Sequence, residues 1–189
     1  MTKIYVDGCS YTYGLGLDRQ HSLGVLLGAH EDRSRPGKSN IAMVEDLYQS
    51  LGQEFDTYVV GFTFSSRFLF NINNHEIDMH PGNDEVFLGN INGSTQLENE
   101  YKLLHQYFYK FSTVESFDAR SDFIVDSTIA LFKTLNKRFV VYSWEPRKTI
   151  NEVLYPRNYI PKKYNQSRTN WHLTESGMIK LKELIENKL

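Results

Sequence analysis

Seven residues near the N-terminus, GCSYTYG (8–14), place a serine in a glycine-flanked turn. The preceding run KIYVDG (3–8) is rich in β-forming residues and predicts a strand that ends at Gly8. A turn of this kind can expose the serine hydroxyl, and the backbone N–H of the serine can stabilise an oxyanion. Ser10 is therefore a candidate nucleophile. The sequence leaves a second interpretation open, in which Ser10 only caps the following helix.

A serine nucleophile needs a base, and His172 is the strongest candidate among six histidines. It lies in NWHLTESG (170–177), directly before a predicted C-terminal helix, and Asn170 two residues earlier could orient its ring. His21 and His30 follow Ser10 closely in sequence, but nothing in their context orients them.

The residues between Ser10 and His172 alternate between predicted strands and predicted helices. The predicted strands are 3–8, 56–63 and 138–144, and the predicted helices are 39–52, 95–111, about 115–136 and 174–189. Residues 71–95 and 145–170 are predicted loop excursions. This alternation favours parallel strands and an α/β sandwich, in which ligands bind beyond the carboxyl ends of the strands. Ser10, the residues from Thr63 to Arg67, and Trp144 all follow strand ends.

The composition fits one domain over residues 1–189 and excludes several classes of protein. Net charge is −2, which argues against a nucleic-acid partner, and the single cysteine excludes an internal disulfide. No apolar run is long enough for a signal peptide or a membrane span, so we expect synthesis in the cytoplasm and no membrane partner. The polar segment HEIDMH (75–80) is a weak metal pattern, and we expect no metal or other cofactor.

Four motifs in order resemble the SGNH (GDSL-like) hydrolases. VDGCSYTYG resembles the first block, in a G-C-S-[FY]-T-x-G variant of phage and bacterial type, and PGKSNIAMVEDL resembles the second block. VVGFTFSSRF stands where the third block follows a strand, and NWHLTESG resembles the fifth. The resemblance spans residue 4 to about 180. It implies a three-layer α/β/α sandwich with a mostly parallel, about five-stranded sheet, and ester hydrolysis without a metal.

Carried over residue by residue, the resemblance implies that Ser10 is the nucleophile, His172 the general base and Asn170 its orienting partner. The implied oxyanion donors are Ser10, Gly37, Asn40 and Thr63. Three positions depart from the family pattern. Cys9 stands where an aspartate usually precedes the serine, which the variant motif tolerates, Thr63 stands where an asparagine is expected, and Asn170 stands where an aspartate is expected. The departure at Asn170 removes the negative charge that stabilises an imidazolium.

Substrate contacts are expected from one cation and several aromatic residues near the predicted site. Arg67 could supply positive charge at the oxyanion or bind an anionic part of the substrate. Tyr11, Trp144 and Trp171 could stack on a sugar ring or pack against the core.

These observations predict an SGNH-type serine esterase or deacylase that acts on a small or carbohydrate-linked ester. The departures favour an alternative, a catalytically impaired domain of the same fold with a binding or structural role. Acyl transfer to a sugar hydroxyl is a third use of the same site. The motif variant also implies an accessory phage protein, associated with the virion and in contact with phage structural proteins.

Overall fold

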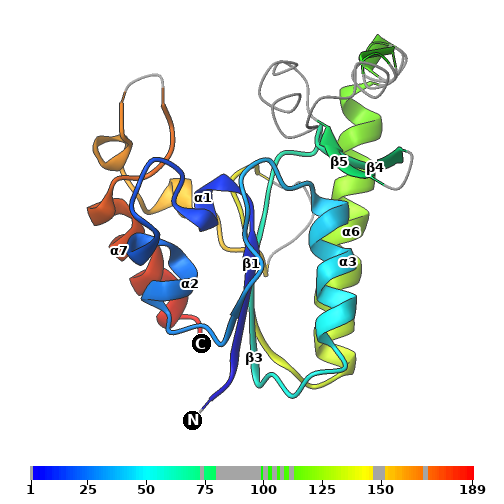
Figure 1. The fold of residues 1–189 in the computed structure, drawn as a ribbon. Helices are drawn as coiled ribbons and strands as arrows, with labels where there is room; N and C mark the ends of the chain where they lie inside the picture. Colours follow the sequence, from blue (N-terminus) through cyan, green and yellow to red (C-terminus); the bar gives the residue numbers. More distant parts are fainter. Residues whose placement is uncertain are drawn as a thin grey trace.

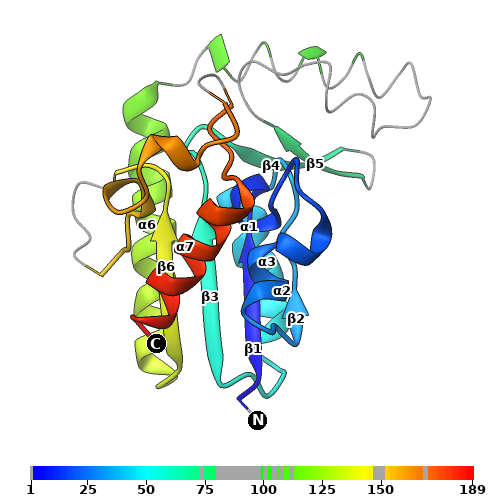
Figure 2. The same cartoon turned by 90° about the vertical axis from the view of Figure 1, so that its left-hand side faces the viewer.

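The structure is a computed structural model that describes residues 2–72, 75–79, 99, 102–103, 106, 109–110, 113–146, 152–167 and 170–189. A parallel sheet with the strand order β2-β1-β3-β6 forms its centre (Figure 2). Its strands are β1 (Ile4–Gly8), β2 (Glu31–Asp32), β3 (Thr57–Phe62) and β6 (Arg138–Ser143). An isolated parallel bridge joins Tyr142 of β6 to Leu154. The described sheet therefore has four strands and one single-pair addition, where about five strands were expected.

Helices cover both faces of this sheet and make a three-layer sandwich (Figure 1). The helices α3 (Asn40–Ser50) and α6 (Val114–Thr134) cover one face, and α2 (Leu23–Leu26) and α7 (Glu175–Glu186) cover the other. The predicted α/β sandwich is confirmed. No helix in the described part of the chain is both long and apolar enough to cross a membrane.

Helix starts and strand burial follow from local sequence. The Ser39 hydroxyl accepts a hydrogen bond from the backbone N–H of Ala42 at the start of α3, and Thr174 does the same for Gly177 at the start of α7. Every residue of β3 is buried, as expected for a central parallel strand covered on both faces. Because β1, β2, β3 and β6 are parallel, their carboxyl ends lie at one edge of the sheet.

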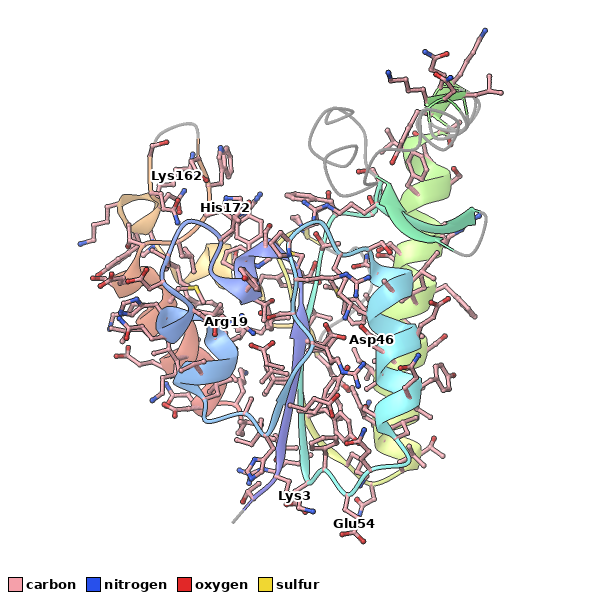
Figure 3. The ribbon with its side chains drawn as sticks, in the orientation of Figure 1. Lys3, Arg19, Asp46, Glu54, Lys162 and His172 are labelled. Atoms are coloured by element: carbon pink, nitrogen blue, oxygen red, sulfur yellow. The ribbon has the colours of Figure 1, made fainter. Side chains whose placement is uncertain are left out.

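A buried ion cluster ties the loop before α3 to the end of β1. Lys38 is fully buried, and its Nζ donates to Asp7 Oδ1 of β1 and to Asp46 Oδ2 of α3, both at 2.5 Å. Asp46 faces the sheet from α3 (Figure 3). Burial raises the pKa of Asp7 to about 6, although the ammonium of Lys38 opposes the rise. The cluster fixes the position of Gly37, which precedes Lys38 in this loop.

Residues 71–95 are not wholly a loop excursion. The strands β4 (Phe68–Ile72) and β5 (His75–Met79) form an antiparallel pair separate from the main sheet. FLFNI is mostly apolar and HEIDM alternates between polar and apolar residues from Glu76 on, both of which are typical of strands, but the many asparagines of residues 71–95 favoured a loop. The part from residue 80 to 95 and most of the predicted helix 95–111 lie outside the described residues. Between 145 and 170, the described helical elements are two 3₁₀ turns, Pro156–Asn158 and Lys162–Tyr164.

Candidate active site

Ser10 is the first residue of the short helix α1 (Ser10–Tyr13), which starts directly after β1. The residue at the cap position is Cys9, so the interpretation of Ser10 as the helix cap is wrong. A residue at this position has a backbone N–H with no acceptor inside the helix. The side chain of Ser10 is 4% exposed. The turn therefore presents a hydroxyl and a free N–H together at the carboxyl end of the sheet.

The spacing of residues within GCSYT has a packing reason in this chain. A Cβ at Gly8 would enter the side chain of Thr12, which folds back over the strand end from the first turn of α1. The Thr12 hydroxyl lies 2.7 Å from the hydroxyl of Tyr142 on β6, so this turn is held across the sheet. Gly14 closes α1 with φ of +77°, a conformation that glycine adopts without strain. The glycines at either end of the turn thus allow its shape.

His172 and Ser10 are hydrogen bonded although 162 residues separate them. His172 Nε2 lies 2.9 Å from Ser10 Oγ, and His172 Nδ1 lies 2.7 Å from Asn170 Oδ1. The backbone N–H of His172 also donates to Asn170 Oδ1 at 3.1 Å. The three side chains have the geometry that a nucleophile, a base and its orienting partner require.

Gln166, which the sequence reasoning missed, orients Asn170. The amide nitrogen of Gln166 donates to two backbone carbonyls, those of Leu15 at 2.7 Å and Leu173 at 3.1 Å. Its oxygen therefore faces Asn170, whose Nδ2 donates to it at 2.8 Å. Asn170 must then present its own oxygen to His172. An oxygen at Nδ1 selects the tautomer with the proton on Nδ1 and leaves the Nε2 lone pair for the hydroxyl of Ser10.

Gly16 leaves the space that Gln166 fills. A Cβ at Gly16 would lie 2.6 Å from the Gln166 side-chain oxygen, and Gly16 has φ of +87°. A glutamine in an irregular loop carries no motif, so only the fold could reveal this contact. The stretch GCSYTYGLG contains Gly16 as a third glycine, but the sequence alone gives no structural reason for it.

Gly37 lies in the loop that runs alongside the end of β1. The backbone N–H groups of Arg33 and Arg35 donate to the carbonyls of Val6 and Gly8, which extends the pairing of β2 beyond its two residues. Gly37 then turns the chain with φ of +79°. The predicted backbone donor therefore lies in the loop after β2, beside the end of β1 from which the Ser10 turn starts.

Thr63 and Asn40 are bound to each other at the end of β3. The backbone N–H of Thr63 donates to Asn40 Oδ1 at 2.8 Å, and Asn40 Nδ2 donates to the carbonyl of Thr63 and to Ser121 Oγ at 3.3 and 2.7 Å. Both residues are buried. Because the Asn40 amide is used inside the core, its role here is to hold the turn at Thr63, and its predicted role as an oxyanion donor gains no support.

Tyr11 supports the ring of the base. Its ring stacks on His172 with centroids 4.7 Å apart and on Trp144 with centroids 4.5 Å apart. Trp144, predicted to bind substrate, is 4% exposed and packs behind Tyr11. Trp171, also predicted to bind substrate, is 45% exposed beside the site. Tyr11 and Trp144 are therefore buried and support the ring of His172, whereas Trp171 is accessible to a ligand.

A cavity of about 470 Å³ opens next to the base. It is lined by Tyr11, Phe64, Arg157, Asn170, Trp171 and His172. Arg67 packs against Phe64, with its Cζ 5.3 Å from the ring centroid. Burial and the positive charge of Arg67 both lower the pKa of His172. Both effects favour the neutral imidazole, which is the form that can accept a proton. Figure 3 shows His172 above α1 at this end of the sandwich.

Three comparisons place these features beside known proteins. No protein-family model matches the chain, and no curated protein matches it. Among solved structures, an esterase, EstA, from Pseudoalteromonas sp. is similar over 100% of this chain and 96% of its own, with 10% identity and a TM-score of 0.49. The structure of TesA is similar over 100% and 98%, with 13% identity and a TM-score of 0.47. A protein assigned to the G-D-S-L lipolytic family from Desulfitobacterium hafniense covers 100% of both chains, with 12% identity and a TM-score of 0.44. Structural similarity with sequence identities of 10–13% and TM-scores below 0.5 carries no information about the activity of this chain.

The arrangement can perform nucleophilic acyl chemistry with its own side chains. Among the described residues there is no group of three or more His, Cys, Asp or Glu that could hold a metal ion. The structure brings together Ser10, His172 and Asn170 as predicted. It adds Gln166, and it adds Arg157 to the wall of the cavity.

Proposed function

We propose that the protein is an SGNH-type serine ester hydrolase, an esterase or deacylase. The observation that carries this proposal is the continuous hydrogen-bond chain from Gln166 through Asn170 and His172 to Ser10. It sets the histidine tautomer that a serine nucleophile requires. The open cavity beside His172 is the place where a small or carbohydrate-linked ester would bind.

In the proposed reaction, Ser10 Oγ attacks the ester carbonyl carbon and His172 Nε2 takes the hydroxyl proton. The carbonyl oxygen becomes an oxyanion, for which the backbone N–H groups of Ser10 and Gly37 are the proposed donors, together with the hydroxyl of Thr63. Collapse of this intermediate breaks the bond to the alcohol oxygen, which receives the proton from His172. Water then attacks the acyl carbon while His172 Nε2 takes its proton. The second intermediate collapses with cleavage of the bond between the acyl carbon and Ser10 Oγ, His172 returns the proton to Oγ, and the free acid leaves.

Asn170 in place of an aspartate is consistent with this reaction. The known cost of such a change in serine proteases, about 10⁴ in turnover, arises largely from the wrong histidine tautomer. Here Gln166 holds the Asn170 amide so that its oxygen, and not its nitrogen, faces the ring. The site lacks the negative charge but keeps the tautomer.

The experiment compares the wild type with Ser10→Ala. We expect a fluorophosphonate probe to label the wild type and the wild type to hydrolyse 4-nitrophenyl acetate, and we expect Ser10→Ala to lose both. Ser66→Ala is a matched control that replaces another serine and keeps the triad. Wild-type protein that shows neither labelling nor hydrolysis would refute the hydrolase and favour a binding domain of the same fold.

A further inference from the structure

A cationic and aromatic surface lies beside the base and takes no part in the hydrogen-bond chain. Arg157 Cζ lies 4.8 Å from the ring centroid of Trp171, and Lys162 Nζ lies 5.6 Å from it. The two cations come from the two 3₁₀ turns between β6 and α7, and Figure 3 shows Lys162 on this loop near His172. Two positive charges therefore flank the exposed ring at the cavity mouth.

A third cation, Arg67, packs against Phe64, which lines the cavity. Arg67 follows β3, and its Nη1 is buried with no hydrogen-bond partner among the described residues. Burial raises the pKa of Tyr11, and the guanidinium groups of both Arg157 and Arg67 oppose the rise. The charges of Arg157 and Arg67 both act on Tyr11, and the ring of Tyr11 stacks on His172. The positive charge is therefore concentrated at the end of the cavity that contains His172.

Nothing acidic balances this charge in the described walls. A smaller cavity of about 70 Å³ adjoins the larger one and shares Arg157 and Trp171 with it. No aspartate or glutamate is among the described residues that line either cavity. The indole N–H of Trp144, which also lines the smaller cavity, is buried and has no acceptor among the described residues. Donors and positive charge without a carboxylate are the features of a site for an anion.

We infer that Arg67, Arg157, Lys162 and Trp171 form an anion subsite for a carboxylate or phosphate group carried by the ester substrate. This inference rests on the proposed function, because it assigns the substrate class of the same site. Arg157 is its main ligand, since its planar guanidinium can bind two oxygens of the anion at once. The apolar face of Trp171 then covers the part of the substrate next to the charge.

A kinetic test uses esters that differ only in charge. The pairs are 4-acetoxybenzoate against its methyl ester, with the charge on the alcohol side, and mono-4-nitrophenyl adipate against 4-nitrophenyl hexanoate, with the charge on the acyl side. We expect the wild type to favour the anionic member of one pair in kcat/KM. Arg157→Gln should lower that ratio about tenfold, the effect of one charge-assisted hydrogen bond. Arg157→Lys should retain part of the preference.

Lys163→Gln is the matched control for these variants. Lys163 neighbours Lys162 in sequence, but its Nζ lies over the ring of Tyr164 instead of Trp171. We expect it to leave both members of each pair unchanged. A wild type with no preference for the anionic member of either pair, or an equal loss in Lys163→Gln and Arg157→Gln, would overturn the subsite.

A binding test does not depend on turnover. The indole N–H resonance of Trp171 is followed in Ser10→Ala while inorganic phosphate or succinate is added at constant ionic strength. We expect a saturable shift with one of these anions, and a dissociation constant about tenfold higher when Arg157→Gln is added. The anion with the lower dissociation constant identifies which group, phosphate or carboxylate, the subsite prefers. No saturable shift with either would contradict the subsite even in an active hydrolase. Saturable binding by a protein that hydrolyses no ester would instead keep the subsite and refute the proposed hydrolase.

Discussion

Replacing Gln166 with methionine tests whether the hydrogen-bond chain selects the histidine tautomer. Methionine keeps the length of the side chain and removes the amide. Asn170 then loses the 2.8 Å bond that its nitrogen donates to Gln166, and either end of its amide can face His172. A flipped amide would donate to Nδ1 and favour a proton on Nε2. In that tautomer the base cannot accept the proton of Ser10.

The size of the effect follows from the one lost bond. An intramolecular hydrogen bond contributes about 1 kcal/mol, with a spread of about 0.5 kcal/mol, and ~1.4 kcal/mol is a factor of ten. The flipped amide should therefore become about threefold to tenfold more populated relative to the correct one. The backbone N–H of His172, which also donates to Asn170 Oδ1, limits the change. We expect kcat to fall by about threefold to tenfold at most.

Two assays follow the change. Nitrogen-15 chemical shifts of His172 above its pKa report which ring nitrogen carries the proton, and ester hydrolysis reports kcat. The matched control places Gln166→Met in an Asn170→Asp background, where a symmetrical carboxylate has no amide to flip. We expect the tautomer and kcat to respond in the asparagine background only. An unchanged tautomer in Gln166→Met, or the same loss in both backgrounds, would refute the reasoning.

Three further changes test the charges and the packing around the site. Arg67→Gln should raise the pKa of His172, because the positive charge of Arg67 lowers that pKa in the wild type. The acid limb of the kcat/KM profile should then move to higher pH. A histidine NMR titration measures the shift, and an unchanged pKa would contradict the effect assigned to Arg67. Lys38→Met should lower the free energy of unfolding by about 3–5 kcal/mol at neutral pH, since it leaves the buried carboxylate of Asp7 without its cationic partner. The loss should shrink at pH 5 as Asp7 takes up a proton, and a loss below about 1 kcal/mol in urea unfolding would refute this. Gly61→Ala should cost about 1–3 kcal/mol because its Cβ would enter a buried tyrosine ring, whereas Gly52→Ala, with open space around it, should cost much less in the same assay.

Part of the fold and site could be predicted because local sequence controls it. The apolar runs of β1, β3 and β6 and the capped, periodic helices α3 and α7 are local patterns, and the structure has them within a few residues of the expected bounds. The β4–β5 pair was missed because asparagine and glycine are frequent over residues 71–95 and favour turns, although FLFNI and HEIDM together contain one asparagine.

The site divides in the same way between local pattern and tertiary contact. Ser10 was a candidate from its turn, because a serine among glycines after a strand has a local cause. His172 was a candidate from its loop, next to Asn170. Whether the two meet depends on the parallel order of the strands and the docking of α7, and the 2.9 Å contact between Nε2 and Oγ is a property of the fold alone.

By itself, the sequence determined the residue types that can do the chemistry and the sheet edge at which they gather, since turns, caps and apolar periodicity act over a few residues. Only the tertiary structure decided how Asn170 is used. Gln166, two backbone carbonyls and the space above Gly16 come from distant parts of the chain, and together they turn the amide oxygen toward His172. An asparagine that the sequence marks as a departure thereby becomes an orienting partner, because hydrogen-bond direction depends on neighbours that no local pattern encodes.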